Sequence, residues 1–410
     1  MAVLPPVIGH FTRTRVIVLV TGRTAVARVG GVTAVHRHVA TAARLGLDPL
    51  VLYPSRMKAL GAEIVAELDG AAECLPADEL DDRAGQDEDL ALVIAGDWYV
   101  APSAILAFDT STRGSAVARF EDHGRRVAPL ARITIAALRA LIPKLANRPS
   151  GELIDAATEP GAAVVTLPAI DRHRLSDNVA VARCEAKLFG WVGDGIKSPL
   201  ARALQRWLAV PLTRGLVGTG ITPAQVAAGK FVVGILAAIV VARGSYAAGV
   251  AGATLYFISR MLDLVSGDLS RAIVVEGARG DKADVLGDVV AMFAMLVALA
   301  LHVGGPSPWP AAWTAALIAA TGVMISTVVA YRRMFRVLWE PAPAGRHRWH
   351  ERGAARPDSF PTRFWTRHGL ALALLLAALI GRLDLFLWAA ALGAHLYYIA
   401  WLGSESEQQS

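Results

Sequence analysis

The residues with the clearest chemical potential are acids and glycines that recur at helical spacing where apolar stretches meet polar sequence. Asp263 stands at the end of one apolar stretch, and Asp284 and Asp288 stand at the start of the next. Residues four apart share one face of a helix, so Asp284 and Asp288 project together. The same spacing places Asp263 and Gly267 on one face. Two helix ends can therefore present acids to one cavity, and charges there are rarely incidental.

These acids have the chemistry of a metal-diphosphate site. Carboxylate oxygens are the hard ligands that Mg²⁺ and Mn²⁺ prefer, and magnesium is commonly held by a few carboxylates together with substrate phosphates. We therefore predict that Mg²⁺ or Mn²⁺ is bound by Asp263, Asp284 and Asp288.

The neighbouring glycines and one arginine are predicted to bind the phosphates. Gly267 and Gly280 have no side chain where a phosphate or nucleotide must approach the backbone. Arg271 offers a permanently charged fork for a phosphate oxygen.

The acids also have a simpler interpretation, as ion pairs at an ordinary membrane interface. The basic residues available for such pairs are Arg260, Arg271, Arg279 and Lys282. Three aspartates in register with two glycines and an arginine over 26 residues are harder to explain in this way. We favour the metal-diphosphate interpretation.

The acids are carried by the second and third of six apolar segments. The segments are 224–241, 245–262, 283–303, 309–331, 369–381 and 385–402. About twenty residues span a bilayer, which predicts an all-α domain of six transmembrane helices. The last two segments are short and are separated by Arg382 and Asp384, so a re-entrant pair is the alternative there.

The first half of the chain alternates short apolar runs with amphipathic stretches. Examples of the runs are 16–20, 50–53 and 90–95, and examples of the stretches are 33–45, 55–68 and 133–145. This alternation predicts a layered α/β domain of the Rossmann-like type.

Composition agrees with one soluble and one membrane part. The 410 residues are 54% hydrophobic and carry a net charge of +6. The arginines concentrate beside the apolar segments, with nine between residues 332 and 367, so anionic lipids explain the charge better than nucleic acid does. The Arg-rich loop is predicted to be cytoplasmic, together with the N-terminal domain and the acids. The two cysteines indicate neither a disulfide framework nor a zinc site.

The segment with the acids resembles the signature of the CDP-alcohol phosphatidyltransferase family, D-x-x-D-G-x-x-A-R, eight residues, G-x-x-x-D-x-x-x-D. The matching positions are Asp263, Gly267, Arg271, Gly280, Asp284 and Asp288. Ser266 replaces the second aspartate and Ser270 replaces the alanine. Upstream, Thr222-Pro-Ala-Gln-Val226 is similar to the entry to the family's first span.

The resemblance implies a transferase of phospholipid biosynthesis. It would move a phosphatidyl or phospho-alcohol group from CDP-diacylglycerol or a CDP-polyol to an alcohol acceptor and release CMP. Asp288 would be the catalytic base, and the enzyme would be a homodimer among the lipids of a bacterial inner membrane. The alternative, motivated by Ser266, is a catalytically impaired relative that binds nucleotide or lipid or regulates a partner.

The N-terminal half resembles MobA-like nucleotidyltransferases in a diverged form. Gly30 to Gly46 and Val93-Ile-Ala-Gly-Asp97 carry the likeness, which implies Asp97 as a possible nucleotide or metal ligand. The order of the two halves is similar to bifunctional inositol-phosphate cytidylyltransferase/phosphotransferases. We predict a nucleotidyltransferase-like domain at 1–195, a basic amphipathic helix at 196–222, six spans at 223–403 and a polar tail at 404–410.

Overall fold

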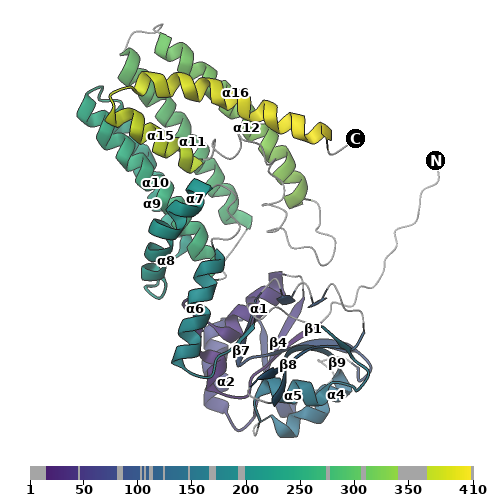
Figure 1. Ribbon diagram of the computed structural model, residues 1–410. Coiled ribbons are helices and arrows are strands. Elements are labelled where there is room, and N and C mark those ends of the chain that lie inside the picture. Colours follow the sequence, from purple (N-terminus) through teal and green to yellow (C-terminus); the bar gives the residue numbers. More distant parts are fainter. Residues whose placement is uncertain are drawn as a thin grey trace, which may run out of the picture. The chain divides into compact units, whose positions relative to one another are not determined.

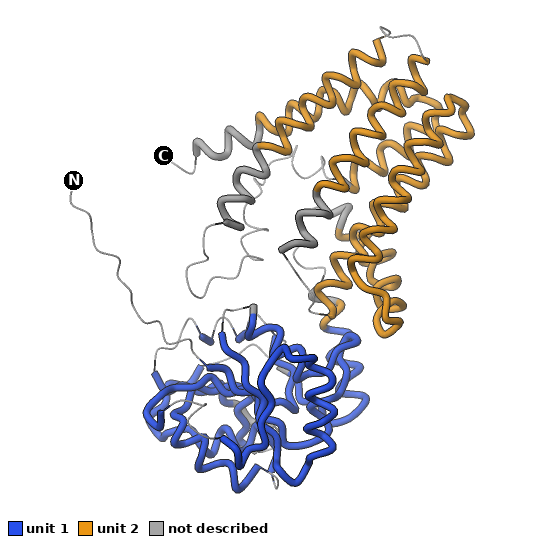
Figure 2. Tube along the Cα trace, turned by 180° about the vertical axis from the view of Figure 1, so that it is seen from behind, with its two compact units in different colours: residues 1–187, 343–346 blue, residues 188–342, 347–410 orange. Residues whose placement is uncertain are grey.

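The chain divides into two compact units, residues 1–187 with 343–346 and residues 188–342 with 347–410 (Figure 2). The structure is a computed structural model. It describes residues 15–44, 47–80, 86–101, 104–105, 108–109, 114–122, 125–145, 148–165, 172–192, 199–273, 278–305, 311–339 and 367–407. Each unit is described by itself below.

The first unit is built on a mixed sheet of seven strands (Figure 1). Their spatial order is β10 (Ala163–Val164), β8 (Ala116–Asp122), β9 (Arg125–Thr134), β6 (Leu90–Ala95), β1 (Arg15–Leu19), β4 (Asp48–Tyr53) and β5 (Glu73–Pro76). Strands β5, β4, β1 and β6 are parallel, whereas β9 runs antiparallel to β6 and β8. The central strands are continuous apolar runs, as expected where both faces of a sheet are covered.

Helices pack on this sheet. They are α1 (Ala34–Arg44), α2 (Lys58–Leu68), α4 (Ile135–Leu141) and α5 (Ser150–Ala157). Helix α6 (Asn178–Val192) follows them in the chain. Helix α1 buries Val35, Val39 and Ala42 at helical spacing and packs on β4 and β1. Shorter elements are η1 (Arg23–Val26), β2 (Arg28–Val29), β3 (Val32–Thr33), η2 (Ala77–Glu79), β7 (Trp98–Val100), η4 (Ile142–Lys144) and β11 (Arg172–Arg174). The α/β prediction for this half is confirmed.

The second unit is helical. Its elements are α7 (Pro199–Leu204), the π-helix η6 (Gln205–Ala209), α8 (Val210–Leu216), α9 (Pro223–Val241), α10 (Tyr246–Ile273), α11 (Ala278–Gly304), α12 (Ala311–Trp339), α15 (Arg367–Leu379) and α16 (Leu383–Glu407). Helix α9 packs on α10 and α11, and α15 packs on α10. Large apolar side chains such as Ile239, Leu317 and Leu392 are more than half exposed, which suits a lipid-facing surface.

Within the described residues, four helices are long and apolar enough to cross a membrane, rather than the six that we predicted. They are Pro223–Val241, Tyr246–Ile273, Leu286–Gly304 and Ala311–Val328. The two other predicted segments form shorter apolar helices, His368–Leu379 and Leu383–Ile399. At 1.5 Å rise per residue, the 13 residues of α15 extend about 20 Å, which is less than the roughly 30 Å hydrocarbon core.

The segment before the first span lies along α10. Gln205, Ala209 and Thr213, spaced four residues apart, are buried, and Ala209 belongs to a core cluster with residues of α10. Trp207 and Leu212 on the other side are 77% and 52% exposed. This segment is therefore amphipathic. Helix α9 then begins with a capping box, in which Thr222 and Gln225 bond reciprocally before Pro223 at the first turn.

Candidate functional site

The predicted site residues of the second span all lie on α10, a continuous helix of 28 residues. Asp263 and Gly267 are one turn apart, as the spacing predicted. A Cβ added at Gly267 would lie 3.6 Å from the nearest atom, the Arg271 guanidinium, so no backbone crowds this position. Ser266, which replaces the family's second aspartate, donates its hydroxyl to the carbonyl oxygen of Asp263 at 3.0 Å. The Ser266 hydroxyl therefore donates its hydrogen bond within α10.

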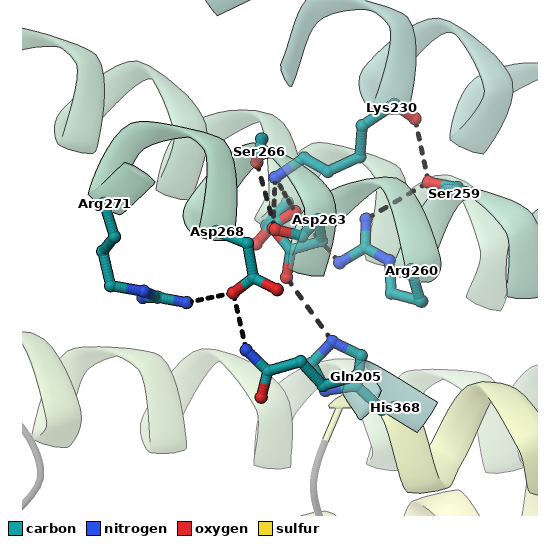
Figure 3. A network of polar contacts seen from close by, with 10 residues as sticks. Gln205, Lys230, Ser259, Arg260, Asp263, Ser266, Asp268, Arg271 and His368 are labelled. Atoms are coloured by element: carbon teal, nitrogen blue, oxygen red, sulfur yellow. Dashed lines mark hydrogen bonds and ion pairs between the residues drawn. The ribbon is translucent and has the colours of Figure 1, made fainter. Parts of the chain in front are cut away.

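Two predicted metal ligands meet at one cation (Figure 3). The ammonium nitrogen Nζ of Lys230 on α9 lies 2.7 Å from Asp263 Oδ1 and 3.0 Å from Asp288 Oδ1. Asp263 comes from α10 and Asp288 from α11, so three helices converge at this point. Asp288 is only 4% exposed and Lys230 only 1%. The expectation that acids from two neighbouring helices converge is thus met for Asp263 and Asp288.

A second cation and a histidine border the same acids. Arg260 NH1 lies 3.0 Å from Asp288 Oδ1, and its guanidinium carbon lies 5.4 Å from the centre of the Tyr256 ring. Nε2 of His368, on α15, lies 3.9 Å from Asp263 Oδ2. The predicted interface ion pairs are therefore present in part, because Arg260 does pair with an aspartate of the motif.

Arg271 is paired with an acid outside the motif. Its NH2 group lies 2.6 Å from Oδ1 of Asp268, which also accepts a hydrogen bond from Gln205 Nε2 at 2.6 Å. Asp268 is completely buried, whereas the Arg271 side chain is 31% exposed. One nitrogen of the Arg271 guanidinium is thus bound by Asp268, while about a third of the side chain is exposed.

Two further predicted site residues belong to the third span. Gly280 and Asp284 belong to α11, but their surroundings lie outside the side chains that the structure describes. The same holds for Arg279 and Lys282. Among the described residues, no group of three or more His, Cys, Asp or Glu side chains is arranged to hold a metal ion.

The carboxylates of Asp263 and Asp288 fit a divalent metal ion, provided that one neighbouring cation moves. Asp263 and Asp288 are oxygen ligands of the type that Mg²⁺ and Mn²⁺ prefer, and both already contact one positive group. That group is the ammonium of Lys230, which occupies the point between them. A metal ion can be bound by both carboxylates only if this ammonium moves.

Sequence reasoning missed Lys230, Gln205 and His368. A signal for Lys230 was present, because it is the sole charged residue between residues 224 and 241, inside the first apolar segment. An ionisable residue within a membrane span is by default a functional candidate, and its partner is usually another charge. Gln205 and His368 lie at helix ends and carried no comparable signal.

In the first unit, Asp97 lies where the strand order reverses. β1 adjoins β4 on one side and β6 on the other, and ligands of open α/β sheets bind outside the carboxyl ends of the strands at such a point. Gly96 follows β6 and its N–H donates to Leu19 O at 2.8 Å. An added Cβ there would lie 2.9 Å from that oxygen, so the close approach favours glycine.

Asp97 itself is turned into the protein. It is 5% exposed, and the Ser150 hydroxyl donates a hydrogen bond to its Oδ1. Burial raises the pKa of Asp97 above its ordinary value, and the Ser150 bond opposes that shift. The position of Asp97, where the strand order reverses, fits a nucleotide site. Its carboxylate, however, accepts a hydrogen bond from Ser150.

Comparison of the chain with protein-family models and with curated proteins found no match.

Proposed function

We propose that the protein is an integral-membrane CDP-alcohol phosphotransferase. It transfers a phosphatidyl or phospho-alcohol group from a CDP-activated donor, CDP-diacylglycerol or a CDP-polyol, to an alcohol acceptor and releases CMP. The observation that carries the proposal is the meeting of Asp263 and Asp288, from two apolar helices, at one buried cation. This is the juxtaposition of acids that a site for a diphosphate and a divalent ion requires.

The donor is bound through its phosphates and the acceptor through its hydroxyl. Arg271, with its guanidinium partly exposed and fixed by Asp268, binds a phosphate oxygen. Gly267 and Gly280 leave the backbone open to the diphosphate. Asp288 accepts the proton of the acceptor hydroxyl, whose oxygen then attacks phosphorus while the bond to the CMP oxygen breaks.

Mg²⁺ or Mn²⁺ is the cofactor in this proposal. Asp263, Asp284 and Asp288 would hold it, and when bound it supplies positive charge for the diphosphate and the leaving CMP. Lys230 and Arg260 are further positive groups beside the same acids.

The proposed setting is a bacterial inner membrane. Helices α15 and α16 would join the four long helices in a six-helix domain, since α15 packs on α10 and α16 on α12. The acids, the Arg-rich loop and the N-terminal domain would be cytoplasmic. The N-terminal domain would bind nucleotide near Asp97, either to make the CDP-polyol or to dock a partner. Assembly as a homodimer follows from the family resemblance.

A second candidate function is that of an impaired relative that binds nucleotide or lipid without turnover. Ser266 favours it, because a neutral hydroxyl that donates to Asp263 O replaces a carboxylate. Lys230 favours it too, because the ammonium lies where a metal ion would lie.

The test is CMP release by membranes containing the full-length protein, supplied with CDP-diacylglycerol or CDP-inositol, an alcohol acceptor and Mn²⁺. We expect Asp288→Asn to lower the rate by about a hundredfold or more, the scale of general base catalysis. Asp384→Asn removes an exposed acid that is paired with Arg382 outside the site and should not change the rate. Equal turnover by wild type and Asp288→Asn would remove Asp288 as the base. Nucleotide binding without any CMP release would select the second candidate.

A further inference from the structure

Lys230 is an unusual charge among the described residues of the second unit. It lies in the middle of α9, whose other residues from 224 to 241 are uncharged, and its side chain is 2% exposed. Placing a lysine there costs free energy unless the ammonium is paired. Asp263 and Asp288 provide that pairing at 2.7 and 3.0 Å.

The helix backbones hold Lys230 close to these acids. The Ser259 hydroxyl on α10 donates to the carbonyl oxygen of Lys230 at 2.8 Å. One turn further along α9, Gly234 lets α9 approach the same serine, since an added Cβ would lie 3.1 Å from Ser259 Oγ. The lysine is thus part of a tightly packed contact between α9 and α10.

An ammonium and a divalent ion cannot share the point between these carboxylates. The nitrogen is 2.7 to 3.0 Å from the two oxygens, whereas magnesium binds oxygen at about 2.0 to 2.1 Å. A metal held by both Oδ1 atoms would therefore lie about where Nζ now lies. Overlap and repulsion between like charges would force one of the cations out.

We propose that Lys230 is an internal competitor for the metal ion. Its ammonium holds Asp263 and Asp288 together in the metal-free protein, and a divalent ion binds this pair only by displacing it. The inference depends on the proposed function only in taking these two aspartates as metal ligands. It assigns Lys230 the role of setting metal affinity, so that only an ion able to outcompete a built-in cation occupies the pair.

The competing explanation is that Lys230 is a permanent structural counter-ion and that metal binds without involving this pair. The two explanations differ in what happens to metal affinity when the ammonium is removed. Competition predicts tighter binding, because no internal cation must be displaced. A permanent counter-ion predicts unchanged or weaker binding.

The experiment measures Mn²⁺ binding to the purified full-length protein in nanodiscs by electron paramagnetic resonance, without nucleotide. Lys230→Met keeps a long apolar side chain and removes the charge. We expect its Mn²⁺ affinity to rise about tenfold or more, and adding Asp263→Asn to that variant should abolish the gain. Arg243→Met is the charge-matched control, an equal loss of charge beyond the end of α9, and should change affinity less than about twofold.

Equal Mn²⁺ affinity in wild type and Lys230→Met would overturn the proposal, as would a gain that survives Asp263→Asn. Lys230→Gln is the second variant if the methionine variant does not fold. If neither variant folds, the lysines of the wild-type protein are acetylated with and without Mn²⁺, and the modification of Lys230 is measured by mass spectrometry. Mn²⁺ should increase modification of Lys230, and no increase would refute the competition.

These outcomes are separate from the transferase proposal. Tighter Mn²⁺ binding in Lys230→Met together with no CMP release would keep the role of Lys230 and remove the enzyme. CMP release with unchanged Mn²⁺ affinity would do the reverse.

Discussion

Replacement of Asp268 with alanine tests how the segment before the first span is attached to α10. Asp268 is fully buried, and its Oδ1 accepts hydrogen bonds of 2.6 Å from both Gln205 and Arg271. Gln205 lies 63 positions earlier in the chain, so this carboxylate joins η6 to the helix that carries Asp263. Alanine would leave the Gln205 amide buried without this acceptor.

The expected loss follows from the two bonds. A hydrogen bond to a charged group contributes about 1.5 to 3 kcal/mol, so two contribute about 3 to 6 kcal/mol. The carboxylate also pays for burial, since its Oδ2 has no partner among the described residues, and this places the net loss near the lower end, about 3 kcal/mol. For a unit of this size, that corresponds to a fall in Tm of roughly 6 to 12 °C.

The assay is thermal unfolding of the full-length protein in detergent, followed by near-UV circular dichroism. Asp268→Asn keeps an acceptor for Gln205 and loses only the charge facing Arg271, so we expect about half the effect. Gln205→Ala combined with Asp268→Ala should cost less than the sum of the single changes, because the residues share one bond. A Tm within about 2 °C of wild type for Asp268→Ala would refute this account of the attachment.

Two further predictions concern packing and pH. At Gly252 an added Cβ would lie 2.4 Å from Val241 Cγ2 and 2.8 Å from Ala237 O, so Gly252→Ala should lower stability by about 1 to 3 kcal/mol in thermal unfolding. Gly229→Ala, where nothing lies within 4 Å, is the matched control, and equal effects would contradict the packing argument. Burial lowers the pKa of His38 from 6.5 to about 4, against the opposing bond to Trp98 O, so the unfolded chain binds its proton first as pH falls. The free energy of unfolding of the first unit, measured by pulse proteolysis, should therefore fall by about 3 kcal/mol between pH 6.5 and 4, at 1.36 kcal/mol per pH unit. His38→Gln should remove this pH dependence. An equal pH dependence in His38→Gln would contradict the prediction.

Local patterns in the chain were enough to predict its two-part organisation. Strands β1, β4 and β6 are continuous apolar runs, and α1 has its apolar residues at helical spacing, so both follow from periodicity. The same is true of α9, whose first turn is determined by Thr222, Pro223 and Gln225. The strands β8 and β9 were not predicted, because Arg119, Glu121 and Arg125 interrupt their apolar pattern.

The number of membrane-spanning helices did not follow from composition alone. Residues 369–381 and 385–402 are as apolar as the longer segments, but Gly381 takes a positive φ of 71° and α15 ends at Leu379. Helix length depends on where the chain turns, and hydropathy alone did not determine whether this pair was long enough to span.

For the site, spacing alone determined which residues share a helix face, because 3.6 residues per turn is a property of the backbone. It placed Asp263 with Gly267 on α10. Only the tertiary structure decided that Asp263 and Asp288 meet at Lys230 and that Asp288 also pairs with Arg260. These partners come together because α9 packs on both α10 and α11, and a buried charge in that packing must be neutralised by whichever opposite charge the neighbouring helix presents.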